Sequence, residues 1–137
     1  MIKQIMKFSG IIIGAAGIIE KDGKFLLTKR SKLIAEGGKW CLPGGHVKKW
    51  EKAEKALERE IMEELGVKSK SSFLFVKEEF RKDLNLHAVT FVFKTKLFGK
   101  IKPNWEVSEV KFFSKKEIMD LDMAFTHKEM LKRYWDD

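Results

Sequence analysis

GHVKKWEKAEKALEREIMEELGV, residues 45–67 of the 137-residue chain, is the stretch that decides its fold class. From about Glu51 to Leu65, apolar residues recur every four positions, which predicts an amphipathic helix. These residues are Ala53, Leu57, Ile61 and Leu65. Gly66 supplies the stop, because glycine readily takes the left-handed conformation that ends a helix. The glycine-rich residues 36–45 cannot be helical, so we expect a loop that leads into this helix.

Three glutamates lie on one side of this helix, next to its apolar face. Glu60, Glu63 and Glu64 stand at positions i, i+3 and i+4, within an arc of roughly 100°. Like charges at this spacing repel by a few tenths of a kcal/mol per pair, and the helix dipole disfavours negative charge in the last turns. A divalent cation would reverse both effects, and carboxylate oxygens suit Mg²⁺ or Mn²⁺. The alternative is a solvated acidic face balanced by neighbouring lysines.

The flanking residues extend this pattern. The full stretch is Gly45-x5-Glu51-x7-Arg59-Glu60-Ile61-x-Glu63-Glu64-x-Gly66-Val67. It resembles the Nudix box, the signature of the Nudix hydrolases, with every specified position filled. Residues 40–45 and 106–113 also resemble the segments that usually flank the box, so the similarity covers roughly residues 10 to 121.

The resemblance implies a role for each of these positions. The implied metal ligands for Mg²⁺ or Mn²⁺ are Glu60, Glu63, Glu64 and the backbone carbonyl of Gly44. Arg59 would hold the glutamates in place, and Glu51 would orient Arg59. A fixed guanidinium partly offsets repulsion between carboxylates, so this pairing is physically reasonable.

The implied reaction is hydrolysis of a phosphate–phosphate linkage by water. Metal ions neutralise the phosphate oxygens and lower the pKa of the attacking water, and a carboxylate accepts its proton. The candidates for this general base are Glu109, Glu106 and Glu63, in that order; an ordinary exposed strand edge is the alternative for the first two.

Substrate contacts are less well marked. Arg30 and Lys39 face the glycine-rich loop in sequence and are candidates for phosphate binding. Trp105 lies in a predicted loop, where it would stack on a base or pack against the protein. Trp40 and Trp50 are expected to pack. The histidines show no pair at metal-ligand spacing and are expected to be structural or solvated; they are His46, His87 and His127.

The remaining pattern predicts a mixed α/β fold. Strands are expected at residues 10–20, 25–30, 72–80, 86–98 and 107–113, with an Asp-Gly turn at 21–24. A short helix is expected at 114–121, and a last helix at Thr126 with a capping box to Glu129. This order favours a mixed sheet with helices on both faces. The resemblance implies a Nudix-type α/β/α sandwich, as a single domain over residues 1–137.

Composition narrows the class of protein. The chain is 44% hydrophobic and 35% charged with a formal net charge of +8, so it is globular and favours an anionic partner. The single Cys41 indicates a reduced, cytoplasmic setting and a buried thiol. Lys3 and Lys7 before the apolar residues 10–19 imitate a signal peptide. We expect a buried strand there, and no membrane partner, because the run is too short to span a bilayer.

The expected function is that of a MutT-like nucleoside triphosphate pyrophosphohydrolase acting on a small-molecule nucleotide. Only about ten residues precede the first strand, whereas ADP-ribose hydrolases of the family commonly carry a longer N-terminal segment. The alternatives are a pyrophosphatase for ADP-ribose or another nucleotide conjugate, and a non-catalytic module that binds nucleotide or RNA. The complete box favours catalysis, and the scattered lysines do not favour RNA. A monomer and a homodimer both remain open.

Overall fold

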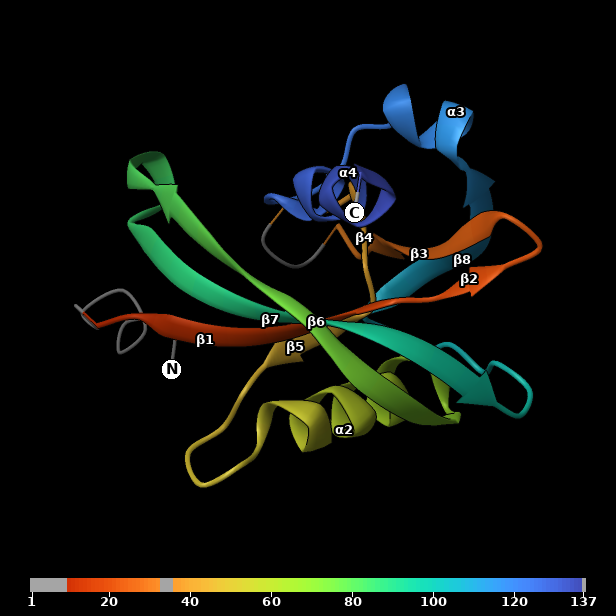
Figure 1. The fold of residues 1–137 in the computed structure, drawn as a ribbon, viewed down its shortest axis with the longest axis horizontal. Helices are drawn as coiled ribbons and strands as arrows, with labels where there is room; N and C mark the ends of the chain where they lie inside the picture. Colours follow the sequence, from red (N-terminus) through yellow and green to blue (C-terminus); the bar gives the residue numbers. More distant parts are fainter. Residues whose placement is uncertain (1–9, 33–35, 137) are drawn as a thin grey trace.

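The computed structural model describes residues 10–32 and 36–136. Two β-sheets form its centre, with helix α2 on one side and helices α3 and α4 on the other (Figure 1). The strands are β1 (Ile12–Ile18), β2 (Glu20–Lys21), β3 (Lys24–Arg30), β4 (Trp40–Cys41), β5 (Gly44–His46), β6 (Lys68–Arg81), β7 (Leu86–Phe98) and β8 (Val107–Ser114). The helices are α2 (Ala53–Leu65), α3 (Lys115–Met119) and α4 (His127–Asp136), with a short 3₁₀ turn, η1, at Lys82–Leu84.

The larger sheet is mixed, as the sequence predicts. Its strand order is β5-β1-β7-β6, with β1 and β7 parallel and the other two pairs antiparallel. The smaller sheet is antiparallel, and β3 lies between β8 and both β2 and β4. The apolar run in β1 is buried in the middle of the larger sheet, which confirms the predicted strand. Lys3 and Lys7 lie outside the described residues.

Helix α2 covers one face of the larger sheet. Leu57, Ile61 and Leu65 are fully buried and pack with Ala15 of β1 and Phe93 of β7. The helix ends where predicted, because Gly66 takes a left-handed conformation with φ of 67°. It begins later than predicted, with Lys52 as the N-cap, so Glu51 stands in the preceding loop. The backbone of Glu51 is therefore outside the helix, and its side chain can reach back toward α2.

Helix α4 covers the opposite face. Its Met130 and Leu131 pack with Ala16 of β1, Leu42 and Phe75 of β6 in a second core. Helix α3 begins with a capping box formed by Ser114 and Glu117. Each side of the larger sheet is thus closed by its own apolar cluster.

The prediction for Trp50 is wrong. Trp50 was expected to pack but is 92% exposed in the loop before α2. The hydroxyl of Thr126, predicted to begin the last helix, donates a hydrogen bond of 3.2 Å to Oε1 of Glu79. This contact joins residues 47 positions apart in the chain, which a local pattern does not encode.

The burial of α2 yields a stability prediction. We expect Leu57→Ala to lower the free energy of unfolding by about 2–5 kcal/mol, because it leaves a cavity under the helix. Met62→Ala on the same helix is the control, since Met62 is 43% exposed, and should change stability by no more than about 0.5 kcal/mol. Urea unfolding followed by circular dichroism measures both. Equal losses in the two variants would contradict the assignment of this buried face.

Candidate active site

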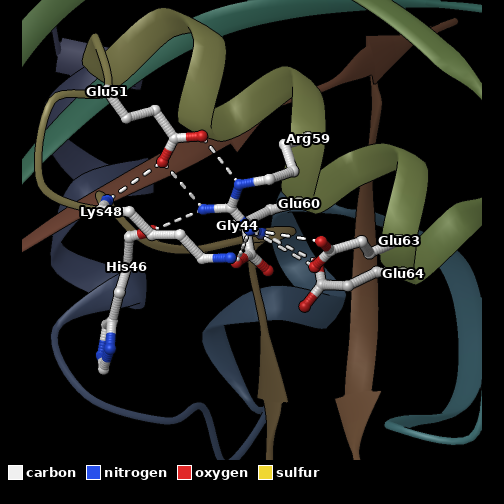
Figure 2. A network of polar contacts seen from close by, with 8 residues as sticks. All are labelled: Gly44, His46, Lys48, Glu51, Arg59, Glu60, Glu63 and Glu64. Carbon is white, nitrogen blue, oxygen red and sulfur yellow. Dashed lines mark hydrogen bonds and ion pairs between the residues drawn. The ribbon is translucent and has the colours of Figure 1, made fainter.

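The guanidinium of Arg59 joins the loop before α2 to the glutamates on the helix (Figure 2). Its Nε and Nη2 donate to the two oxygens of Glu51 at 2.8 and 3.0 Å. Its Nη1 donates to Glu60 at 2.8 Å and more weakly to Glu63 at 3.4 Å. Nη2 also donates to the carbonyl of His46 at 3.0 Å. The predicted pairing of Arg59 with Glu51 is present, as a two-pronged contact.

Charge explains why Glu51 stays ionised. The hydrogen bond from Arg59, with a second from the backbone N–H of Lys48, lowers the pKa of Glu51 to about 2. The same contacts raise the pKa of Arg59. The ion pair is therefore charged on both sides throughout the neutral range, and it fixes the orientation of Arg59.

The carboxyl groups nearest the sheet have raised rather than lowered pKa values. Burial raises the pKa of Glu64 to about 8, and the charges of Glu60 and Glu106 act in the same direction. Burial also raises the pKa of Glu60, against the hydrogen bond from Arg59. Glu63 is 49% exposed by its side chain. The site thus holds negative charge that its own surroundings compensate only in part.

Two glycines bring the β5 backbone against these carboxylates. The N–H of Gly44 donates to Glu64 at 3.1 Å. A Cβ on Gly44 would lie 2.1 Å from the carbonyl oxygen of Ala15, and one on Gly45 would lie 2.4 Å from Cδ of Glu60. Gly44 also has φ of +151°, which L side chains rarely adopt. Only glycine fits here, and it leaves the peptide groups accessible beside the acidic cluster.

A distant loop adds a fourth carboxylate. The N–H groups of Lys102 and Asn104 donate to the carbonyls of Leu65 and Glu64 at 2.6 and 3.0 Å, which fastens residues 101–106 to the end of α2. Asn104 in turn accepts from the N–H of Glu106 at 2.9 Å. Glu106 is thereby close enough to Glu60 and Glu64 to raise the pKa of both.

The other sequence candidates have different surroundings. Glu109 is exposed on β8, opposite Lys29 in the register. Trp105 is 68% exposed. Lys39 forms an ion pair of 3.0 Å with Glu36. Of the candidate general bases on the loop and β8, Glu106 is the one whose charge acts on both Glu60 and Glu64.

A cleft of about 140 Å³ opens on the α4 side of the larger sheet, beside β5. Gly14, Ala16 and Ala88 form a floor of small residues, and Gly44 and Gly45 border it on the side of the acidic cluster. Its other lining residues are Ile12, Ala15, Arg30, Leu42, His46, Glu79, Leu86, Thr90, Phe125 and His127. β5 is the edge strand of the sheet. This one strand therefore lies between the cleft and the carboxylates.

Arg30 is the predicted phosphate-binding residue that does line the cleft, with its guanidinium 5.1 Å from the centre of the Phe125 ring. Sequence reasoning missed Glu79 and Phe125, because neither belongs to a motif. His127, expected to be structural or solvated, accepts the N–H of Leu42 at 2.9 Å through Nδ1. Burial lowers its pKa to about 4, so it is neutral at pH 7.

The donor set suits a hard divalent cation. Glu60, Glu63 and Glu64 offer carboxylate oxygens beside an open backbone, and burial disfavours the ionised form of Glu64, which a cation would stabilise. No group of three acidic, His or Cys side chains among residues 10–32 and 36–136 is already arranged around one point. Arg59 and Gly44 hold Glu60 and Glu64 in hydrogen bonds, so these two carboxylates would reorient on binding a cation.

Comparison with known proteins identifies the family. The model of the NUDIX domain matches residues 10–134. The chain belongs to the Nudix family. An ADP-ribose pyrophosphatase of Methanocaldococcus jannaschii is 36% identical over 124 residues, which cover 89% of this chain and 72% of that protein. A CTP pyrophosphohydrolase of Escherichia coli is 44% identical over 54 residues, 39% of this chain and 40% of that protein.

A solved structure supports the fold independently. The crystal structure of a MutT protein from Methanosarcina mazei superposes with a TM-score of 0.81 at 24% identity, over 92% of this chain and 94% of that one. The chain is therefore a Nudix hydrolase with the family's mixed α/β fold, acting on pyrophosphate bonds of nucleotide derivatives. None of the helices formed by the described residues is long and apolar enough to cross a membrane.

The raised pKa of Glu64 predicts a pH-dependent stability for the metal-free chain. Between its ordinary value of 4.5 and about 8, only the folded state keeps the proton, so unfolding releases it and rising pH favours unfolding. We expect the free energy of unfolding to fall by at most about 1.4 kcal/mol per pH unit in this window.

The measurement is urea unfolding at pH 5.5, 7.0 and 8.5 with a metal chelator present. Glu64→Gln removes the titrating group while keeping its shape, so the difference between the two chains isolates this carboxyl from Glu60 and others. Parallel pH profiles for the two chains would show that Glu64 does not titrate in this range.

Proposed function

We propose that this Nudix hydrolase is a nucleoside triphosphate pyrophosphohydrolase. The observation that carries the proposal is the junction at Gly44 and Gly45, where a cleft of about 140 Å³ meets the carboxylates of α2. We assign this cleft to the nucleobase of the substrate. The triphosphate would then run from the cleft across β5 to the carboxylates.

The chain's own residues supply binding and orientation. The small floor of the cleft admits a flat ring, and Arg30 at its wall brings positive charge toward the phosphates. Arg59, fixed by Glu51, orients Glu60 and Glu63. Glu60, Glu63 and Glu64, with the carbonyl of Gly44, would hold Mg²⁺ or Mn²⁺. When bound, such an ion neutralises phosphate oxygens and lowers the pKa of an attacking water.

Glu106 is the best placed of the proposed general bases. The loop that carries it is hydrogen-bonded to the end of α2, and its charge already acts on Glu60 and Glu64. Glu109 is exposed on β8, opposite Lys29. A water attacking phosphorus beside Glu60 would therefore pass its proton to Glu106 more readily than to Glu109.

Similarity in sequence supports two substrate classes. The matched segment of the E. coli CTP pyrophosphohydrolase supports a nucleoside triphosphate. The longer match to the M. jannaschii ADP-ribose pyrophosphatase favours ADP-ribose as the second candidate. ADP-ribose would need space for its terminal ribose outside the cleft, on the far side of the carboxylates.

The test is product release from a panel of nucleoside triphosphates, ADP-ribose and nucleotide sugars with Mg²⁺ or Mn²⁺. We expect a nucleoside triphosphate to give the highest kcat/KM. Glu63→Gln should lower kcat at least a hundredfold, because it removes a charge that the reaction uses. Glu58→Gln on the same helix is the control, since Glu58 pairs with the exposed Lys55 at 3.2 Å.

The outcomes separate the candidates. ADP-ribose as the best substrate would replace the first candidate by the second. Nucleotide binding without cleavage of any compound would instead favour a non-catalytic module.

The proposed role of Glu106 as general base yields a separate prediction. Glu106→Gln should lower kcat by about 10²–10⁴-fold, the usual contribution of general-base catalysis, and should flatten the acidic limb of the pH–rate profile. Glu109→Gln is expected to stay within a few-fold of the unsubstituted chain. The reverse order of effects would assign the base to Glu109.

A further inference from the structure

Glu79 is a buried carboxyl group with one oxygen unsatisfied. The residue is 5% exposed, on β6. Its Oε1 accepts the hydroxyl of Thr126 at 3.2 Å. Its Oε2 is buried and has no hydrogen-bond partner among the described residues. Leaving a buried acceptor unpaired costs roughly 1–3 kcal/mol, so packing alone does not account for a glutamate at this position.

The location of Glu79 suggests what pairs with it. Glu79 stands opposite Ala88 in the β6–β7 register, and both line the cleft whose floor also includes Gly14. The cleft is the recess in which the proposed function places the nucleobase. A ligand in it would lie against a carboxylate on one wall and against small residues below.

A second group on the wall has a defined hydrogen-bonding character. The Nδ1 of His127 accepts the N–H of Leu42 at 2.9 Å. Since the ring is neutral at pH 7, its proton lies on Nε2. His127 also lines the cleft and carries its one ring proton on Nε2, whereas Glu79, when ionised, offers only acceptors. Thr126 ties the two together, because it is the neighbour of His127 and orients the carboxyl group of Glu79.

We propose that Glu79 determines base specificity by accepting a hydrogen bond from an exocyclic amino group. The inference rests on the proposed function in one respect, that the base of the substrate occupies this cleft. Cytosine, adenine and guanine carry an amino group on the edge used for pairing. Uracil, thymine and hypoxanthine carry a carbonyl oxygen at a corresponding position, and this would place two acceptors face to face in a buried site.

The experiment compares substrates that differ by one such group. CTP and UTP differ at position 4 of the base, and ATP and ITP differ at position 6; in each pair a carbonyl oxygen replaces the amino group. The ratio of kcat/KM within each pair is measured at pH 8.5, because burial raises the pKa of Glu79 and the carboxylate form is the one under test. We expect the unsubstituted chain to favour the amino-bearing member of at least one pair by tenfold or more.

Glu79→Gln should reduce that preference at least tenfold, since the amide can donate to a carbonyl oxygen. Glu78→Gln is the matched control, because Glu78 is the adjacent, exposed residue on β6. A purely structural role for Glu79 would lower activity on both members equally and leave the ratio unchanged, and that result would overturn the inference. Thr126→Val, which removes the orienting hydroxyl, is a second variant and should reduce the preference in part.

The same comparison separates this inference from the proposed function. If ADP-ribose is cleaved and triphosphates are not, ADP-ribose is compared with its inosine analogue, and a Glu79-dependent preference supports the inference while the triphosphate assignment fails. If nothing is cleaved, calorimetric binding of CMP and UMP replaces kcat/KM. Equal affinity of the unsubstituted chain for the two, or no binding of either, would overturn the inference.

Discussion

The contact between Arg59 and Glu51 is the constraint on which the rest of the site depends. One guanidinium joins a loop carboxylate, the carbonyl of His46 on β5 and two glutamates on α2. The planar fork of arginine meets a carboxylate with two parallel hydrogen bonds, and lysine cannot reproduce this. Because Glu51 is held by Lys48 as well, the loop, the edge strand and the helix keep one relative position.

The larger sheet has an acidic cluster on one side and a cleft on the other, and β5 borders both. On the α2 side lie the acidic groups, where burial, together with the charges of Glu60 and Glu106, raises the pKa of Glu64. On the α4 side lies a cleft with a small-residue floor and an unsatisfied carboxyl oxygen of Glu79. Gly44 and Gly45 leave no room for a side chain, since a Cβ would lie 2.1 Å from the carbonyl oxygen of Ala15 at the first position and 2.4 Å from Cδ of Glu60 at the second. Both glycines also line the cleft, so the backbone of β5 borders the cleft and the acidic groups.

The sequence predicted the parts of the structure that depend on local interactions. The four-residue spacing of Leu57, Ile61 and Leu65 predicted the buried face of α2, and all three are fully buried. β7 matched its predicted range of residues 86–98. The start of α2 was predicted too early. Glu51 fits the helical pattern, but it lies outside the helix and its side chain pairs with Arg59.

The sequence by itself identified the family through its resemblance to the Nudix box, and its apolar periodicity predicted the helix that carries the glutamates and the mixed fold around it. The tertiary structure decided which distant residues join them. Glu106 reaches the cluster because the N–H groups of Lys102 and Asn104 bond to the end of α2. Glu79 meets Thr126 across 47 positions of sequence. Contacts of this kind depend on how strands and loops pack across the sheet, and no periodic pattern along the chain records that packing.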